Sequence, residues 1–532
     1  MKKLPIGIQN FKEIIDENHV YVDKTQYIYN LLNNEKHYFL SRPRRFGKSL
    51  LLDTIAESFG GEKELFKGLW IYDSDYAFSK YPVVRLDMSN IPNKNPETLE
   101  YSLLSELRDL AKKESLYIDS AEPAILFSDL IESLHNKYNQ KVAVLIDEYD
   151  KPILDHIDDS KIAEENRKVL RGFYGILKSM DRYLRFTFIT GVSIFAKTSI
   201  FSELNNLKDI SMSEEYAEIC GIPVNSLELY FGERIAELAK LDRFKKYDSV
   251  TEAILAWYDG YSWDGRTRLL NPFSLLSFFS DKRIGSYWYS TGTPKFLVDM
   301  IKKRPESTLS LNKLRITEPL LNAFEIERIE IEPLLFQTGY LTVSEVVETM
   351  GMPIYVLDIP NNEVRDAFSM HIVAALTESG NMRAGQAQMD ICRALESGDL
   401  DAMLEMLRGL FASIPYELHI KEEAYYHSIF YAVMIMLGFD IDVEVSTSRG
   451  RIDAILELSD KAYIMEFKYE KCPSGVNRDE KAALFDTALT SAIEQINNKG
   501  YGDRFKGSGK SIYKTAFAFL GRDEIEMRME TG

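Results

Sequence analysis

Short apolar runs alternate with longer amphipathic stretches over about the first 210 residues of the chain. Four of these runs have the length of strands: Tyr38–Leu40, Pro82–Leu86, Val142–Ile146 and Phe186–Ile189. The segment Pro123–Tyr138 carries apolar residues at helical spacing, which predicts a helix leading into the third strand. Strands that alternate with helices are typical of a parallel α/β sheet. We therefore expect an α/β domain over residues 1–215.

The pattern changes twice further along the chain. Residues 216–400 are mostly of helical character, with aromatic-rich turns at Trp257–Trp263 and Asn271–Ser274, which indicates a helical lid or connector. A new α/β pattern follows over residues 401–532 and predicts a separate compact domain. Its expected elements are a helix over Glu422–Leu437, strands over Arg451–Leu458 and Ala462–Lys468, a helix through Ile493–Asn497 and a strand near Thr515–Leu520.

Length and composition fit this division into domains. A chain of 532 residues is too long for one ordinary core, and 45% apolar with 27% charged residues is typical of a soluble globular protein. No segment approaches the roughly 18 uninterrupted apolar residues of a membrane helix, and the N-terminus does not resemble a signal peptide. We expect a cytoplasmic protein without a membrane partner. Cys220, Cys392 and Cys472 lie far apart, which argues against a disulfide framework or a structural zinc site.

The net charge of −18 argues against a protein that coats nucleic acid by bulk electrostatics. Contacts with phosphates would then be local. Two clusters of basic residues are candidates: Arg42, Arg44, Arg45 and Lys48 near the N-terminus, and Lys499, Arg504, Lys506, Lys510 and Lys514 near the C-terminus.

The segment HYFLSRPRRFGKSLLLDTI has the order strand, tight loop and helix start that a phosphate-binding loop requires. Gly47 lets the backbone approach phosphate oxygens, Lys48 supplies a positive charge to the β- and γ-phosphates, and Ser49 can place its hydroxyl on Mg²⁺. Arg42 occupies the first position of the pattern, where a glycine is usual. An ordinary polar helix cap is the alternative interpretation.

A second motif strengthens this prediction. The apolar run Val142–Ile146 leads directly into Asp147 and Glu148. Asp147 can hold the Mg²⁺ shell, and Glu148 can orient and deprotonate the attacking water. Thr190 follows the next strand, where a polar group can sense the γ-phosphate. The alternative is a pair of buried strands that each end in a polar turn.

Much of the first 345 residues resembles the bacterial AAA-ATPase-like proteins. The resemblance rests on LPIGIQNF, YVDKT, RPRRFGKSLLLDTI, ELFKGLWI, VLIDEYDKP, ITGVSIF, NPFS, STGTPKFL and LLFQTGYLT. Arg42 is usual within that family. The resemblance implies ATP binding, with Asp147 and Glu148 as the second nucleotide motif. The loop residues that it implies are Pro43, Arg44, Arg45, Phe46, Gly47, Lys48, Ser49 and Leu50.

A second group of charged residues occurs in the C-terminal domain, within GRIDAILELSDKAYIMEFKYE. Glu466 and Lys468 are two residues apart and so share one face of a strand, and Asp453 can join them across a hairpin. Two carboxylates, Asp453 and Glu466, can bind Mg²⁺, while a lysine polarises the hydrolytic water. This arrangement resembles the PD-(D/E)XK nucleases. An ordinary exposed strand face is the alternative interpretation.

Residues on both sides of these strands extend the resemblance, which covers about residues 410–520. Glu423 fits the acidic position on an upstream helix, with Glu422 as the fallback. Gln495 lies on a helix that can return to the site, and Tyr501 closes the motif. Isoleucine replaces the usual proline before Asp453, a departure that leaves the metal ligands intact. His427 is interpreted as a packing residue.

Together the motifs predict an ATP-dependent or ATP-regulated protein with a Mg²⁺-dependent nuclease-type domain acting on nucleic acid, with foreign or mobile DNA as the hypothetical target. The basic residues Lys499–Lys514 are expected to lie beside that site. An ATP-driven switch with a non-cleaving nuclease fold is one alternative, and an enzyme for another substrate is a second. Arg44 and Arg45 can stabilise phosphate charge in cis, and the oligomeric state stays open, a homo-oligomer included.

Overall fold

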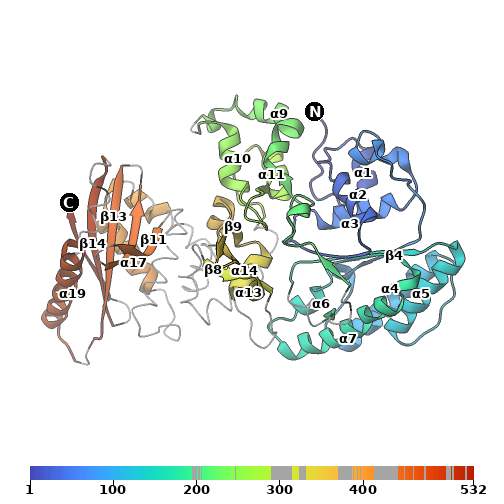
Figure 1. The fold of residues 1–532 in the computed structure, drawn as a ribbon. Coiled ribbons are helices and arrows are strands. Elements are labelled where there is room, and N and C mark those ends of the chain that lie inside the picture. Colours follow the sequence, from blue (N-terminus) through green and yellow to red (C-terminus); the bar gives the residue numbers. More distant parts are fainter. Residues whose placement is uncertain are drawn as a thin grey trace. The chain divides into compact units, whose positions relative to one another are not determined.

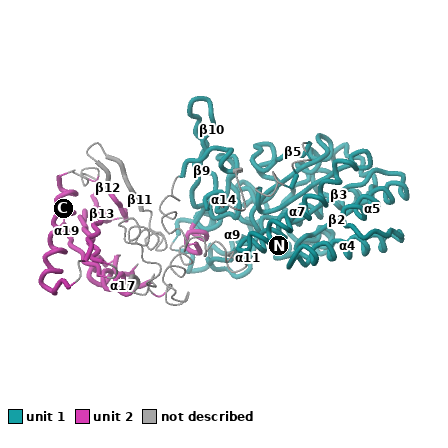
Figure 2. Tube along the Cα trace, turned by 90° about the horizontal axis from the view of Figure 1, so that it is seen from below, with its two compact units in different colours: residues 1–291, 313–361 teal, residues 292–312, 362–532 magenta. Residues whose placement is uncertain are grey.

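The computed structural model describes most of the chain, in two compact units. The described residues are 1–194, 200–201, 204, 206–245, 247–288, 314–322, 331–368, 386, 389–391, 393–395, 397–412, 441–447, 450–458, 460–472, 475–498, 505, 509–521 and 524–531. One unit comprises residues 1–291 and 313–361, and the other comprises residues 292–312 and 362–532 (Figure 2). Each unit is described by itself.

A five-stranded parallel sheet forms the centre of the first unit. Its order is β2-β3-β4-β1-β5. The strands are β1 (His37–Ser41), β2 (Val83–Asp87), β3 (Val142–Asp147), β4 (Leu184–Gly191) and β5 (Lys208–Asp209). The first four confirm the predicted strands. Every residue of β1 and β3 is buried, as expected when helices cover both faces of a parallel sheet.

Helices lie on both faces of this sheet (Figure 1). One side carries α1 (Phe11–Asp16), α2 (Thr25–Asn33) and α3 (Lys48–Ser58). The other carries α4 (Pro96–Lys113), α5 (Pro123–Tyr138), α6 (Lys151–Leu154) and α7 (Ser160–Ser179). The observed α5 has the predicted bounds, because Pro123 supplies a proline at its start and Asn139, with φ 49°, ends it in the left-handed conformation.

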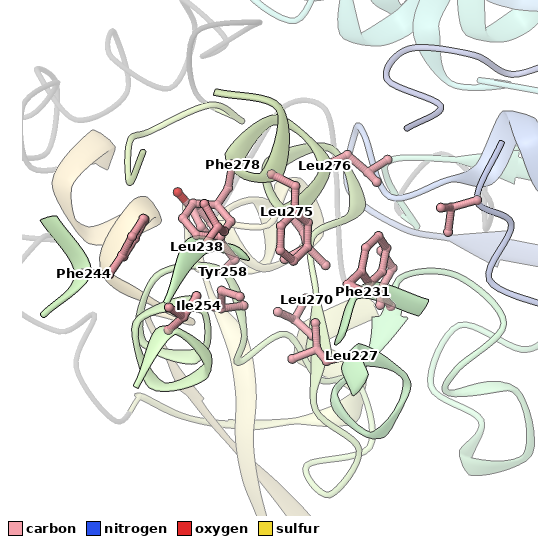
Figure 3. Close-up of a cluster of buried hydrophobic side chains, with 14 residues drawn as sticks. Leu227, Phe231, Leu238, Phe244, Ile254, Tyr258, Leu270, Leu275, Leu276 and Phe278 are labelled. Atoms are coloured by element: carbon pink, nitrogen blue, oxygen red, sulfur yellow. The ribbon is translucent and has the colours of Figure 1, made fainter. Parts of the chain in front are cut away.

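A second core follows in the same unit. It packs α9 (Leu227–Leu238), α10 (Val250–Tyr258) and α11 (Pro272–Asp281) around a cluster of buried aromatic and aliphatic side chains (Figure 3). In a short antiparallel pair, β6 (Ile222–Pro223) precedes α9 and β7 (Leu269–Leu270) precedes α11. This core belongs to the region predicted as a helical lid.

That region also contains a three-stranded antiparallel sheet that the sequence did not lead us to expect. It comprises β8 (Leu314–Thr317), β9 (Thr342–Thr349) and β10 (Met352–Asp358), with helices α13 (Glu318–Asn322) and α14 (Ile331–Thr338) between β8 and β9. Met350 and Gly351 form the two-residue turn between β9 and β10, and both have positive φ values, 52° and 76°. Such a turn matches the twist of two antiparallel strands.

The second unit contains a five-stranded mixed sheet of order β11-β12-β13-β14-β15. The strands are β11 (Ile441–Thr447), β12 (Gly450–Glu457), β13 (Lys461–Glu470), β14 (Ser511–Leu520) and β15 (Glu524–Thr531). Strands β13 and β14 are parallel, and the other neighbours are antiparallel. Helix α19 (Arg478–Asn498) packs on one face, and α17 (Leu400–Ala412) precedes the sheet. The helix predicted over Glu422–Leu437 lies outside the described residues.

No helix within the described part of the chain combines the length and the apolar character needed to cross a membrane.

Candidate functional site

The loop between β1 and α3 has the geometry of an anion-binding turn. Gly47 caps α3 with φ 95°, a left-handed conformation that an L side chain rarely adopts. Its carbonyl accepts the first helical bond, from the Leu51 N–H at 3.0 Å. The N–H groups of the first turn of a helix have no partner within the helix, and the helix dipole is positive there. This end of α3 can therefore bind phosphate oxygens.

Lys48, the first residue of α3, is 5% exposed. Its ammonium donates to two carbonyl oxygens of its own loop, Arg42 at 2.9 Å and Pro43 at 3.0 Å. Lys48 lines a cleft of about 410 Å³ together with Arg44, Ser49 and Glu148. The loop thus holds a cation at the wall of a cleft large enough for a small-molecule ligand.

Arg42 corrects one prediction, because it is not a surface cation. Its side chain is fully buried, and Nη1 donates to the carbonyl oxygens of Ser41 at 2.8 Å and Ser211 at 2.7 Å. The guanidinium carbon lies 4.0 Å from the ring centroid of Trp263. Burial lowers the pKa of Arg42 to about 10. The predicted N-terminal basic cluster is therefore wrong for Arg42, whereas Arg44 and Arg45 are exposed and Lys48, although buried, lines the cleft.

The remaining loop residues divide between packing and the cleft. Phe46 is fully buried and meets Tyr261 and Trp263 edge-on, with ring centroids 4.9 and 5.1 Å away. Pro43 is buried as well. The side chains of Pro43 and Phe46 therefore support the loop from the protein interior. Arg45 lies over the ring of Phe273, 4.7 Å from its centroid, at the edge of the cleft. Leu50 lines the cleft.

Asp147, Glu148 and Thr190 meet at the carboxyl ends of β3 and β4. The Thr190 hydroxyl donates to Asp147 Oδ1 at 2.5 Å, and the Glu148 N–H donates to the same oxygen at 3.1 Å. Strand β4 lies between β3 and β1, and Leu40 of β1 pairs with Thr190. The sheet therefore brings both carboxylates to the edge where the phosphate loop begins.

Glu148 has two unusual properties. Its backbone adopts φ 50°, which is uncommon for a residue other than glycine and is often found at functional sites. Burial raises the pKa of its carboxyl group, nearby Asp147 adds to this, and Lys48 opposes it. A carboxyl group with a raised pKa that lines a cleft is a good candidate for a general base.

Asp150 is a site residue that the sequence did not reveal. Its carboxylate is buried and accepts from the backbone N–H groups of Val192 and Ser193, the latter at 2.6 Å. Tyr149 donates to the Ser193 carbonyl at 2.9 Å. A Cβ on Gly191 would lie 2.5 Å from the Tyr149 ring, so glycine is required there. These contacts join the residues after β3 to the residues after β4, which lie more than forty positions further along the chain. No pattern in the sequence around Asp150 indicates them.

Two further segments line the cleft: Pro5 and Gly7 to Gln9 at the N-terminus, and Pro272 with Phe273 at the start of α11. The N-terminal segment is held by Asp53 of α3, whose carboxylate accepts from the Phe11 N–H at 2.6 Å. The motifs LPIGIQNF and NPFS contain these residues. The family resemblance therefore included them but gave them no functional role.

In the second unit, Glu466, Lys468 and Gln495 contact one another. The Lys468 ammonium donates to Gln495 Oε1 at 3.0 Å and lies 3.4 Å from Glu466 Oε1, and the Gln495 amide also donates to that carboxylate oxygen. Glu466 is 1% exposed. Helix α19 therefore carries Gln495 to the face of β13 that holds Glu466 and Lys468.

Asp453 joins this cluster through the backbone. Its Oδ2 accepts from the Phe467 N–H at 2.9 Å. The register pairs Ile455 with Ile464 and Ala454 with Met465. Continued by one residue, this register puts Asp453 opposite Glu466, on the same face of the sheet. Phe467 points to the other face and stacks on Phe517. The structure thus brings Asp453, Glu466, Lys468 and Gln495 together.

Several predicted residues lie outside the described part of the chain: Glu422, Glu423, His427, Lys499, Tyr501, Arg504 and Lys506. Among the described residues, no group of three histidine, cysteine or acidic side chains could hold a metal ion. Asp453 and Glu466 are two carboxylates, so the described part of the cluster lacks a third such group.

The basic rim predicted beside this cluster is wrong for Lys510. Its ammonium pairs with Glu457 at 2.7 Å. The next residue, Ser511, pairs with Lys461 at the start of β13, five residues before Glu466. Lys514 lies opposite Ile464, on the Glu466 face, and donates to Asn497 Oδ1 at 2.7 Å. Of the two described lysines of this predicted rim, Lys510 and Lys514, only Lys514 thus lies near the cluster.

Comparisons with protein-family models give two matches. Residues 5–201 match the family described as "AAA-ATPase_like: Predicted AAA-ATPase". Residues 421–528 match "PDDEXK_9: PD-(D/E)XK nuclease superfamily". The first range contains the phosphate loop, Asp147, Glu148 and Thr190, and the second contains Asp453, Glu466, Lys468 and Gln495.

A relative and a solved structure complete the comparison. The "Uncharacterized protein in vnfD 5'region" of Azotobacter chroococcum mcd 1 is 37% identical over 527 residues, which cover 97% of this chain and 96% of that protein. The Aeropyrum pernix ORC2 protein, solved as ADPNP-ADP complexes, covers 68% of this chain and 98% of its own, at 12% identity and a TM-score of 0.26.

Proposed function

Because the chain belongs to the AAA-ATPase-like family and carries a C-terminal PD-(D/E)XK nuclease superfamily domain, we propose that it binds and hydrolyses ATP and couples this to cleavage of nucleic acid. The observation that supports the proposal best is the meeting of Lys48, Asp147 and Glu148 at one edge of the parallel sheet. Lys48 and Glu148 line one cleft of about 410 Å³, and buried Asp147 directly precedes Glu148.

In this proposal each group of the first site has a distinct task. The N-terminus of α3 and Lys48 bind the β- and γ-phosphates. Exposed Arg44 and Arg45 neutralise phosphate charge from the mouth of the cleft. Glu148 takes the proton of the attacking water, which its raised pKa favours. Thr190 orients Asp147 and senses the γ-phosphate.

Mg²⁺ fits the same site by donor type. Asp147 offers a buried carboxylate, and Ser49 offers a hydroxyl at the start of α3; oxygen donors of this kind are those that Mg²⁺ prefers. When bound, Mg²⁺ neutralises charge that develops on the phosphates. Asp147 and Ser49 would hold it, and the Thr190 hydroxyl would fix the orientation of Asp147.

For the second site we propose a Mg²⁺-dependent nuclease. Asp453 and Glu466 would hold the metal, Glu423 would add the upstream carboxylate, and Lys468 would polarise the hydrolytic water. Gln495 holds Lys468 and Glu466 in place through its amide. The convergence of Asp453, Glu466, Lys468 and Gln495 supports the proposal.

Further parts of the proposal concern the whole protein. We propose three functional regions, residues 1–215, 216–400 and 401–532, and a cytoplasmic location. We extend the function to the processing of foreign or mobile DNA, on the ground that an ATPase is joined to a nuclease-type domain. Size measurement by light scattering, with and without ATP, determines whether the chain forms a homo-oligomer.

The test is incubation of the full chain with labelled DNA and labelled RNA, with Mg²⁺ or Mn²⁺, with and without ATP. We expect cleavage that requires metal and changes with ATP. Cleavage that persists in Lys468→Ala would place the activity elsewhere. If no substrate is cut under any condition while ATP is hydrolysed, the proposal of a nuclease fails in favour of an ATP-driven switch with a non-cleaving module.

A further inference from the structure

Helix α14 contains a single amide side chain, Gln337, which is 3% exposed. Its Oε1 accepts a hydrogen bond from the Ile194 N–H at 3.0 Å, and its Nε2 donates to the Leu321 carbonyl at 3.1 Å. A backbone N–H only donates and a carbonyl only accepts, so these two partners fix the orientation of the amide. Gln337 therefore joins the segment after β4 to α13, the helix that contains Leu321.

The segment of residues 190–194, which Gln337 contacts, also holds two carboxylates of the first site. Its first residue donates its hydroxyl to Asp147, and its third and fourth residues donate their N–H groups to Asp150. Its fifth residue donates its N–H to Gln337. Asp147 and Asp150 lie on either side of Glu148 in the sequence. A shift of this segment would therefore displace both carboxylates that flank Glu148.

The surroundings of Gln337 make its hydrogen bonds costly to lose. Every residue of α14 except Glu332 is buried, and the exposed fractions of Ile194 and Leu321 are 4% and 1%. A buried backbone group that loses its partner costs about 1–3 kcal/mol. An aliphatic side chain could fill the same space but could not pair with these two backbone groups.

The chain directly after α14 contacts the phosphate loop. Gly339 has φ 91°, and a Cβ on it would lie 2.8 Å from the side chain of Pro43. Trp288 donates its Nε1–H to the Arg44 carbonyl at 3.2 Å, and its ring meets Tyr340 edge-on with centroids 5.2 Å apart. The end of α14 and the residues after it therefore lie against both the phosphate loop and the segment after β4.

We propose that Gln337 is a positioning residue for ATP hydrolysis, because it anchors residues 190–194, which in turn hold the carboxylates on both sides of Glu148. The inference rests on the proposed ATP hydrolysis and adds a residue that is not among those lining the cleft. Its second partner, Leu321, lies on α13, which directly follows β8. The same amide thus links the site to the sheet β8-β10-β9.

The test combines steady-state ATP hydrolysis by the full chain with calorimetric titration. Gln337→Met keeps the length of the side chain and removes both hydrogen bonds. We expect kcat to fall about tenfold, the equivalent of one hydrogen bond, while ATP affinity stays within about twofold. Rate and affinity separate because the change displaces groups that act in hydrolysis and leaves Lys48 in place.

Thr338→Val is the matched control on the same helix. Thr338 is 9% exposed and donates its hydroxyl to the Leu334 carbonyl, one turn earlier, at 2.6 Å. Valine keeps the shape of the side chain and removes a bond that stays within α14. We expect kcat and ATP affinity of this variant to remain within about twofold of wild type, with some loss of thermal stability.

A wild-type kcat in Gln337→Met would overturn the proposed role. An equal fall of kcat in Thr338→Val would also overturn it, because α14 would then act through its stability alone. Equal falls of kcat and affinity in Gln337→Met would assign Gln337 to the support of the phosphate loop instead. If wild type itself hydrolyses no ATP, the proposed ATPase fails, and the positioning role fails with it.

Hydrogen exchange of the wild-type chain supplies a second measurement, which decides the question if Gln337→Met does not fold. With Mg²⁺ and the β,γ-imido analogue of ATP bound, the Ile194 amide should exchange at least about fivefold more slowly than in the free protein. Amides of α4, which has no contact with Gln337 among the printed hydrogen bonds of the described chain, serve as the reference. Unchanged exchange at Ile194 would show that the nucleotide does not act on the segment that Gln337 anchors, and would overturn the proposal.

Discussion

The phosphate loop of the first unit and the Glu466 cluster of the second satisfy their charged groups in different ways. Lys48 donates to the neutral carbonyls of Arg42 and Pro43. Lys468 contacts a carboxylate and an amide, which in turn contact each other. Hydrogen bonds to an anion are stronger than bonds to a neutral carbonyl. A phosphate can therefore compete for Lys48 directly, whereas a ligand of the second cluster must first loosen an ion pair.

This difference separates a site that is open to its ligand from one whose polar groups are occupied. Lys48 and Glu148 line a cleft of about 410 Å³. Glu466 is 1% exposed and bonded on its own face of the sheet. We infer that metal binding at the second cluster requires a local rearrangement of Lys468 and Gln495, whereas ATP binding at the first requires only a change of partner for Lys48.

The largest effect is expected for the second cluster. Asp453→Ala or Lys468→Ala should eliminate metal-dependent cleavage, because the first removes a metal ligand and the second the cation beside it. Gel assays with labelled substrate, together with thermal unfolding, provide the measurement. Lys471→Ala, three residues further along and exposed, is the control and should cut normally. Normal cleavage by Lys468→Ala would make the cluster a structural ion pair.

Glu148→Gln comes next. It preserves the shape of the side chain and removes the base, so steady-state ATP hydrolysis should fall by about 10²- to 10⁴-fold while ATP affinity stays within about twofold. Glu100→Gln, an exposed glutamate on α4, is the matched control. A wild-type rate in Glu148→Gln would assign Glu148 a structural role.

A pH series of denaturation in the absence of nucleotide examines the buried cation Lys24. Lowering its pKa from 10.5 to about 8 corresponds to about 3 kcal/mol. Between these two values the unfolded chain binds more protons, so the free energy of unfolding rises with pH through this window. Wild type should gain about 3 kcal/mol relative to Lys24→Met between pH 8 and 10.5. Parallel curves for the two proteins would show that Lys24 is solvated.

The smallest effect is expected for Thr190→Val, which removes the hydroxyl that donates to Asp147. Loss of one hydrogen bond to a carboxylate corresponds to about tenfold in the hydrolysis rate, with little change in ATP affinity. Rate and affinity are measured on the same preparation. A fall in affinity as large as the fall in rate would mean that Thr190 positions the phosphate loop and not Asp147.

Most of the first sheet could be predicted from the sequence because its strands are continuous apolar runs, such as Val142–Ile146. The antiparallel sheet β8-β10-β9 could not, because the turn between β9 and β10 is Met350–Gly351 and lacks the usual Asn-Gly or Asp-Gly signal. The surrounding residues were interpreted as part of a mostly helical region. Tertiary structure holds Met350 at φ 52°, and nothing in the local sequence indicates this turn.

The site residues likewise divide into those that could be predicted from the sequence and those that could not. Asp147 and Thr190 lie at the ends of apolar strands, and Lys48 lies in the loop motif before α3, so local patterns located all three. Asp150 acts through Val192 and Ser193, and contacts over that separation depend on which strands are neighbours. Lys510 was predicted beside Glu466 because an acidic protein needs local positive charge to hold phosphates, whereas the parallel register places it next to the start of β13, away from Glu466.

Lys48 is the residue on which the proposed phosphate site depends most, and its ammonium donates to two neutral carbonyls of its own loop. The direct test is calorimetric titration of the full chain with ATP and Mg²⁺. We expect one ATP per chain, an affinity at least about 100-fold lower in Lys48→Ala, and wild-type affinity in the exposed control Lys67→Ala. Wild-type affinity in Lys48→Ala would contradict the assignment of this loop as the phosphate site.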